Sequence, residues 1–179
     1  MRKTILFALV AIGCLNSCND KPADKPAGEV EKKTASMELL PMVVTEPIKA
    51  AFEAFSKKDV DGFTAGLAED VRYFWSSGDS LIGKQAVKDY YSRRFALLDT
   101  ITFTDHIFVP LQMYEPQSAN VPTGKWILHW ANAHATYKNS KHINFWVHQV
   151  NHYNEAGMID YQDQYLDRSQ IAAATAGMK

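Results

Sequence analysis

The fold is decided by residues 125–167, KWILHWANAHATYKNSKHINFWVHQVNHYNEAGMIDYQDQYLD. Three runs rich in strand-forming residues are separated by two turn compositions, KNSK at 138–141 and NEAG at 154–157. Gly157 can adopt the positive φ that the second reversal needs. The stretch therefore predicts three consecutive antiparallel strands at 126–137, 143–153 and 158–166. One face of them carries indoles, imidazoles and amides, which indicates a functional surface.

The residues before this stretch indicate helices and then a fourth long strand. Apolar side chains recur at helical spacing from Ile48 to Phe55, and a short helix at 60–67 and a longer one after Gly83 follow. A short strand is expected at 71–75 and a long one at 102–114, before the Pro-rich loop 115–123. Three helices followed by long antiparallel strands predict an α+β fold with the helices on one side of the sheet.

The N-terminus has the layout of a bacterial lipoprotein signal. Arg2 and Lys3 precede a short apolar run, and Leu15-Asn16-Ser17-Cys18 resembles the lipobox, in which cleavage exposes a cysteine that is then acylated. A cut before Cys14 is the competing possibility. We therefore expect a signal peptide at 1–17 and lipidation of Cys18, which tethers the protein to a membrane and places its domain in the cell envelope of a bacterium, facing the periplasm or on the outer membrane.

The remaining boundaries follow from composition. Residues 18–37 repeat DKPA, are rich in charged residues, Pro and Ala, and contain no aromatic residue, so they are expected to form a disordered linker. A single domain is expected at 38–168, because the chain of 179 residues suits one core. The tail 169–179 has few large apolar side chains to bury and is expected to be flexible.

Charge and cysteine content exclude several classes of function. Cleavage of residues 1–17 removes two positive charges and lowers the formal net charge from −1 to −3, which disfavours nucleic-acid binding. The only cysteine left, Cys18, is acylated, so the mature domain has no disulfide, no thiolate nucleophile and no cysteine metal ligand. The sequence matches neither a nucleophile elbow nor a glycine-rich phosphate loop, and no cofactor is predicted.

A family resemblance rests on four motifs in order: KKDVDGF at 57–63, AEDVRYFW at 68–75, GKQAVKDYYSRRF at 83–95 and NEAGMIDYQDQYLD at 154–167. Together they resemble the SnoaL-like group of the nuclear-transport-factor-2-like (NTF2-like) superfamily. The resemblance implies a cone, in which a strongly curved, mostly antiparallel sheet wraps against the helices around a cavity, and a possible homodimer through the sheet. Because the superfamily includes isomerases, hydrolases, dehydratases, cyclases and binding modules, it does not decide the function.

The catalytic residues of these relatives do not carry over to this chain. The positions that match the tyrosine, the general base and the protonated aspartic acid of ketosteroid isomerase are Ala51, Trp75 and Gln149. None of the three can perform the proton transfer of that enzyme. The positions at which cyclase-type members carry His and Asp are Gln162 and Gln164, which argues against the cyclase mechanism as well.

The match to these positions of the relatives, extended by strand alternation, implies which side chains line the cavity. Such a lining of aromatic walls and neutral amides suits a small apolar or aromatic molecule. In the alternative interpretation the amides satisfy one another and buried waters in a filled core. A shift of one residue in a strand would exchange its two faces. The predicted lining is Trp75, Tyr91, Trp130, Asn132, Gln149, Asn151, Gln162 and Gln164, with Thr136, Val147 and Leu166 beside them.

Two further functions stay open. His134 is the candidate general base of a lyase, isomerase or hydrolase, because imidazole titrates near neutrality and the same alternation places it in the cavity; a structural histidine is the simpler interpretation. The other possibility is a protein-interaction module that uses the outer face of the sheet. No metal site is predicted; His129 and His148, expected on adjacent strands and both facing outward, are the one pair to check.

Overall fold

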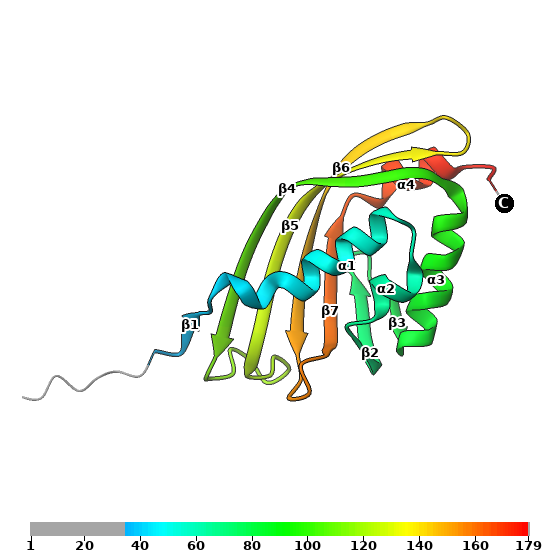
Figure 1. The fold of residues 1–179 in the computed structure, drawn as a ribbon. Coiled ribbons are helices and arrows are strands. Elements are labelled where there is room, and N and C mark those ends of the chain that lie inside the picture. The colour runs from blue at the N-terminus through cyan, green and yellow to red at the C-terminus, as the bar shows by residue number, and fades with distance from the viewer. Residues whose placement is uncertain (1–34, 179) are drawn as a thin grey trace, which may run out of the picture. The chain divides into compact units, whose positions relative to one another are not determined.

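The computed structural model describes residues 35–178. The predictions for the signal peptide and Cys18, and for nearly all of the linker, lie outside the described residues. Residues 35–178 form an α+β fold in which seven strands make one curved sheet in the order β1-β4-β5-β6-β7-β2-β3 (Figure 1). All neighbouring strands are antiparallel except β2 and β7, which run parallel. The predicted fold class is therefore confirmed.

The strands are β1 (Met37–Leu39), β2 (Leu67–Trp75), β3 (Ser80–Ile82), β4 (Leu98–Met113), β5 (Gly124–Tyr137), β6 (His142–Tyr153) and β7 (Ile159–Leu166). The helices are the 3-10 turn η1 (Met42–Thr45), α1 (Glu46–Ser56), α2 (Val60–Thr64), α3 (Lys84–Leu97) and α4 (Arg168–Thr175). The four long strands and first three helices agree with the predicted elements to within a few residues. The short edge strands β1 and β3 and the helix α4 were not predicted.

The C-terminal tail corrects one prediction. Residues 168–175 form helix α4, where a flexible tail was expected. The side chain of Asp167 caps its first turn by accepting a hydrogen bond of 2.9 Å from the Ser169 amide. Ile171 and Ala174 are buried, and Asn139 donates a hydrogen bond of 2.8 Å to the Ala174 carbonyl. Two buried apolar side chains and one cap therefore order a segment that has few large apolar side chains.

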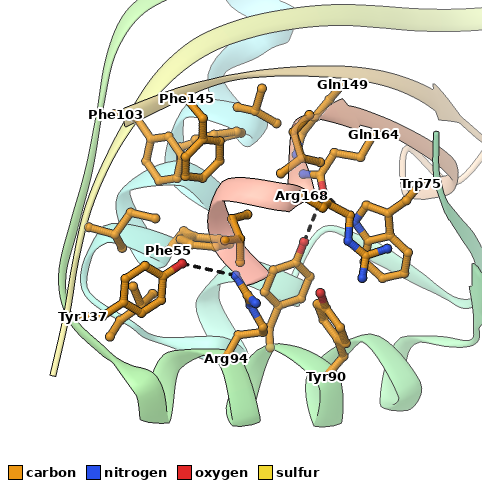
Figure 2. A pocket seen from close by; sticks show the side chains of 17 residues that line it. Phe55, Trp75, Tyr90, Arg94, Phe103, Tyr137, Phe145, Gln149, Gln164 and Arg168 are labelled. Carbon is orange, nitrogen blue, oxygen red and sulfur yellow. Dashed lines mark hydrogen bonds between the residues drawn. The ribbon is translucent and has the colours of Figure 1, made fainter. Parts of the chain in front are cut away.

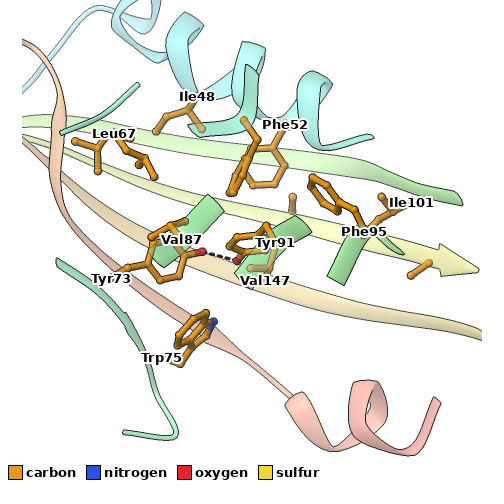
Figure 3. Close-up of a cluster of buried hydrophobic side chains, with 14 of the residues drawn as sticks. Ile48, Phe52, Leu67, Tyr73, Trp75, Val87, Tyr91, Phe95, Ile101 and Val147 are labelled. Atoms are coloured by element: carbon orange, nitrogen blue, oxygen red, sulfur yellow. Dashed lines mark hydrogen bonds between the residues drawn. The ribbon is translucent and has the colours of Figure 1, made fainter. Parts of the chain in front are cut away.

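The core lies between the helices and one face of the sheet, which we call the inner face (Figure 3). Phe55 of α1 makes edge-to-face contacts with Phe63, Tyr91 and Phe95, at centroid distances of 4.9, 5.3 and 4.8 Å. Aromatic pairs in this geometry add to the stability of a buried cluster beyond the area that they bury. This cluster fixes α1, α2 and α3 to one another and sets one wall of the pocket described below.

The middle of the inner face of β5 carries three small residues, Ala131, Ala133 and Ala135, which are all buried. Ala133 pairs with Phe103 of β4 on one side and with Phe145 of β6 on the other. On the inner face of a curved sheet the side chains converge, so alanines in the central strand leave room for phenylalanines from both neighbours. The polar residues that alternate with these alanines, Asn132 and His134, consequently lie on the opposite face of the sheet, which we call the outer face.

Candidate functional site

A pocket opens at the inner face, between the sheet and helices α1, α3 and α4 (Figure 2). It offers about 70 Å³ to the centres of water-sized molecules, enough for several waters or a small organic molecule. Most of its walls are aromatic or aliphatic. The lining residues are Phe52, Phe55, Trp75, Tyr90, Tyr91, Arg94, Leu98, Ile101, Phe103, Tyr137, Phe145, Val147, Gln149, Gln164, Leu166, Arg168 and Ile171.

One end of the pocket carries a chain of neutral hydrogen-bonding groups. The hydroxyls of Tyr73 and Tyr91 lie 2.6 Å apart, and Tyr91 donates to Gln164 Oε1 at 3.4 Å. The same Gln164 oxygen accepts a hydrogen bond of 2.9 Å from the indole nitrogen of Trp75. Gln164 lies on β7 and Trp75 on the parallel neighbour β2, where the two residues are register partners. The network therefore fixes the orientation of the amide and the indole at the pocket wall.

Tyr73 and Tyr91, the two tyrosines of this hydrogen-bond network, remain neutral phenols at physiological pH. Burial raises the pKa of Tyr73 well above its usual value, and the neighbouring Tyr91 adds to this effect. Burial also raises the pKa of Tyr91, partly offset by its hydrogen bond with Tyr73. A neutral phenol donates one hydrogen bond and accepts others, so the two phenols hold the Gln164 amide in place without adding a charge to the pocket.

Two arginines complete the lining. Arg168, at the start of α4, forms an ion pair with Asp79, donates to the Ser77 hydroxyl at 2.8 Å, and lies over the Trp75 ring at 5.2 Å from its centroid. Arg94, in the last turn of α3, approaches the Tyr137 hydroxyl at 3.5 Å, near the length limit of a hydrogen bond (Figure 2). The charge of Arg168 is therefore largely compensated within the domain.

The lining contains no residue that serves as a general base at neutral pH. None of its members is Asp, Glu, His, Lys, Cys, Ser or Thr. Its only ionisable groups are the arginines, which stay protonated, and tyrosines; burial raises the pKa of both Tyr91 and Tyr137. The residues of this pocket thus suit the binding of a molecule better than proton abstraction from it.

The structure places the predicted lining residues of three strands and one helix on the inner face. Trp75, Tyr91, Gln149 and Gln164 line the pocket. Asn151 and Gln162 are buried register partners on the same face, but they do not line it. Asn151 instead donates a hydrogen bond of 3.1 Å to the Ile127 carbonyl, as the filled-core interpretation expects of a buried amide. Val147 and Leu166 also line the pocket.

The predicted orientation of β5 was wrong by one residue. Trp130, Asn132, His134 and Thr136 lie on the outer face, because their buried neighbours Ala131, Ala133 and Ala135 occupy the inner one. The His134 ring lies 3.0 Å from the Thr104 hydroxyl and 2.9 Å from the Asn144 side-chain oxygen, so it belongs to a polar row across three strands. It does not face the pocket and cannot act there as a general base.

The histidine pair named as a possible metal site is also divided between the two faces. His129 is fully buried on the inner face, whereas His148 lies on the outer face and stacks on Trp130 at 4.2 Å. Within residues 35–178 there is no group of three or more His, Cys, Asp or Glu side chains arranged to hold a metal ion. In the same part of the chain, no helix has the length and apolar character needed to span a membrane.

Sequence reasoning missed several pocket residues. Arg94 and Tyr137 lie near the ends of their elements, and Arg168 begins a helix that was not predicted. Phe103 and Phe145 face the pocket because β4 and β6 share the inner-face parity of Ala133. The parity of Val147 and Gln149, which was assigned to the inner face, would have placed Phe145 there as well. No signal in the sequence indicates that α4 returns to cover the pocket.

Comparison with known proteins agrees with this architecture. Residues 48–161 match the model of the SnoaL-like domain. The chain belongs to the SnoaL-like family. A search of curated proteins finds no significant match.

Solved structures of the NTF2-like type share the fold at low sequence identity. A putative isomerase from Bacillus subtilis is 14% identical, with a TM-score of 0.59 over 75% of this chain and 93% of its own. A putative polyketide cyclase from Pseudomonas putida is 18% identical, with a TM-score of 0.58 over 75% of this chain and 98% of its own. A protein with a ketosteroid isomerase-like fold from Catenulispora acidiphila, in complex with trimethylamine, is 13% identical, with a TM-score of 0.54 over 72% of this chain and 91% of its own.

Proposed function

We propose that this SnoaL-like domain binds a small apolar or aromatic molecule in the pocket between α1, α3, α4 and the sheet. The observation that carries the proposal is the lining itself, which combines aromatic walls with neutral hydrogen-bonding groups and lacks a general base. Apolar pockets with a few oriented polar groups are the usual form of small-molecule sites. A relative with this fold crystallised with trimethylamine, which supports the use of the fold for small ligands.

Titration with a neutral aromatic probe, 4-phenyl-2-butanone, tests the proposal. We expect saturable binding by calorimetry and a matching change in the fluorescence of Trp75, which lines the pocket. Val147→Phe fills the pocket and should weaken binding at least roughly tenfold, equivalent to about 1.4 kcal/mol. The matched control is Val150→Phe, on the same strand but on the outer face, which should leave binding unchanged. Equal binding by V147F and wild type would contradict the proposal, as would no saturation with any neutral aromatic probe.

The enzyme alternative relied on His134 as a general base. Because His134 lies on the outer face of the sheet, away from the pocket, this alternative loses its catalytic residue.

The interaction alternative has a specific observation in its favour. Trp146, Ile107 and Tyr165 of the outer face are exposed by 52%, 54% and 45%. A second copy of this chain, packed sheet against sheet, is therefore the second candidate function; it leaves the pocket on the inner face accessible.

The cellular location of the protein is proposed from the sequence of its N-terminus. The lipobox-like residues 15–18 support acylation of Cys18 and tethering of the domain to a bacterial membrane through residues 18–37. In a bacterial host, we expect the wild-type chain in the membrane fraction, with a lipid-modified Cys18 in its mass spectrum. Cys18→Ser should abolish both, whereas Cys14→Ser should change neither. Lipid on Cys14, or none on either residue, would contradict this assignment.

A further inference from the structure

We infer that the pocket ligand carries an anionic group, a carboxylate, which Arg94 and Tyr137 bind beside the C-terminal end of α3. This inference rests on the proposed function and adds the chemical class of the ligand. The carboxylate lies at one end of an apolar or aromatic body, which the phenylalanine walls and the Trp75 end enclose (Figure 2).

The first observation is that Arg94 is uncompensated. Its side chain is half-buried in the pocket lining, and among residues 35–178 no carboxylate lies within ion-pair distance of it. Its one side-chain hydrogen bond within that range is the 3.5 Å contact with Tyr137. A guanidinium has five N–H donors and stays charged, so most of its donors are free to bind a ligand.

The second observation is the contrast with Arg168, the other arginine of the lining. Arg168 pairs with Asp79 and donates to Ser77. Its charge is satisfied by the protein, and that of Arg94 is not. The two arginines also contact different residues of the lining, since Arg168 covers Trp75 while Arg94 approaches Tyr137.

The third observation concerns the surroundings of Arg94. Arg94 approaches Tyr137, and the same pocket lining includes the aliphatic side chains of Leu98 and Ile101. In partly apolar surroundings an unpaired charge is costly, and a carboxylate that accepts two parallel N–H bonds compensates it. The neutral Tyr137 hydroxyl can donate a further hydrogen bond to the same carboxylate, because burial raises the pKa of this phenol.

A purely structural role for Arg94 is the competing explanation. Arg94 lies in the last turn of α3, where a positive charge interacts favourably with the helix dipole. Arg93 occupies the adjacent position with an exposed side chain, which is absent from the pocket lining. It therefore provides a matched control that carries the same charge near the same helix end.

The experiment compares two probes of the same shape, 3-phenylpropionate and 3-phenylpropanamide, by calorimetry at pH 7 with the domain 35–179 and the full chain. We expect wild type to bind the acid at least roughly tenfold more tightly than the amide, about 1.4 kcal/mol. Arg94→Gln should abolish this preference while leaving amide binding in place. Arg93→Gln should retain the wild-type preference, and Arg94→Lys should retain part of it, since lysine keeps the charge and loses the planar fork.

The outcomes separate this inference from the proposed function. If wild type binds the amide as tightly as the acid, or Arg94→Gln keeps the preference, the carboxylate inference is wrong and the binding function stands. If Arg93→Gln and Arg94→Gln lose the preference for the acid equally, the preference is caused by positive charge near the end of α3 and not by direct binding to Arg94, and the inference is also wrong. If neither these probes nor 4-phenyl-2-butanone binds, the proposed function fails and this inference fails with it.

Discussion

At the residue scale, His129 shows how the sheet treats a polar side chain on its inner face. The ring is fully buried and packs against Phe52 and Phe108, each at a centroid distance of 4.4 Å. Its Nε2 atom lies 2.9 Å from His106 Nδ1. The pKa of His129 is lowered to about 3, mainly by burial. The neighbouring His106 and His148 also lower this pKa, and a hydrogen bond with Gln149 offsets part of the shift. The residue is therefore a neutral member of the core.

This pKa predicts a loss of stability in acid. The ordinary pKa of histidine is 6.5, so between pH 6.5 and about 3 the unfolded chain binds a proton that folded His129 does not. Above pH 6.5 this proton does not affect the free energy of unfolding. As the pH falls below 6.5, proton binding by the unfolded chain lowers the free energy of unfolding by about 1.4 kcal/mol per pH unit. The loss between pH 7 and pH 5 is about 2 kcal/mol.

Urea unfolding at both pH values measures the effect. His129→Leu replaces the ring with an apolar side chain and should reduce the pH 7 to pH 5 loss by about 2 kcal/mol, whatever its stability at pH 7. His142→Leu removes an exposed histidine on β6 and should retain the wild-type loss. An unchanged pH dependence in His129→Leu would contradict the neutral, buried state of this ring.

His129 also explains why sequence alternation failed in β5 and succeeded in β6 and β7. In β6 and β7, the match of Gln149 and Gln164 to catalytic positions of the relatives indicated the inner face, and alternation extended this assignment to Val147. In β5 the two candidate faces are Trp130, Asn132 and His134, or His129 with alanines. Size favours the first set as pocket walls, yet the curvature of the sheet requires the small residues inside. The alternation rule gives two sets of residues but does not say which set faces the helices.

At the scale of elements, helix α4 closes one side of the pocket, since Arg168 and Ile171 both line it. This helix is held by the local cap of Asp167 at its start and by long-range hydrogen bonds from Asn139 and Lys141 to the carbonyls of its last turn. The longer elements were predictable because their periodic patterns extend over many residues. Helix α4 has eight residues, and its order depends on long-range contacts that a local pattern does not contain.

The cap of α4 gives a prediction at this scale. Asp167→Ala removes an acceptor that bonds the amide and the hydroxyl of Ser169, at 2.9 and 2.6 Å. The helix should lose about 0.5–2 kcal/mol of local stability, the usual effect of deleting an N-cap. Amide hydrogen exchange of residues 168–175 should accelerate, and binding of the pocket ligand should weaken. Asp167→Asn retains a capping side chain and should behave close to wild type; equal exchange in all three proteins would contradict this account.

At the scale of the whole domain, the two faces of the sheet have different roles. The inner face encloses the core and the pocket, and it could be anticipated from the family resemblance together with the residues of β6 and β7. The outer face carries a stack of Trp130, His148 and Tyr165, with centroid distances of 4.2 and 5.6 Å between successive rings. Aromatic side chains concentrated on a solvent-facing surface are typical of an interaction site.

Self-association through the outer face is the prediction at this scale. We expect the purified domain to elute as a dimer in size-exclusion chromatography with light scattering at micromolar concentration. Trp146→Glu places a charge within the exposed apolar surface and should shift the domain to monomer, because an unpaired charge in a closed interface is costly. Met42→Glu changes a similarly exposed side chain in the 3-10 turn η1, which precedes α1 and is not part of the sheet, and should leave the dimer intact. A wild-type domain that remains monomeric at every concentration, or a Trp146→Glu variant that remains dimeric, would exclude this face as the interface while leaving the pocket and its ligand unaffected.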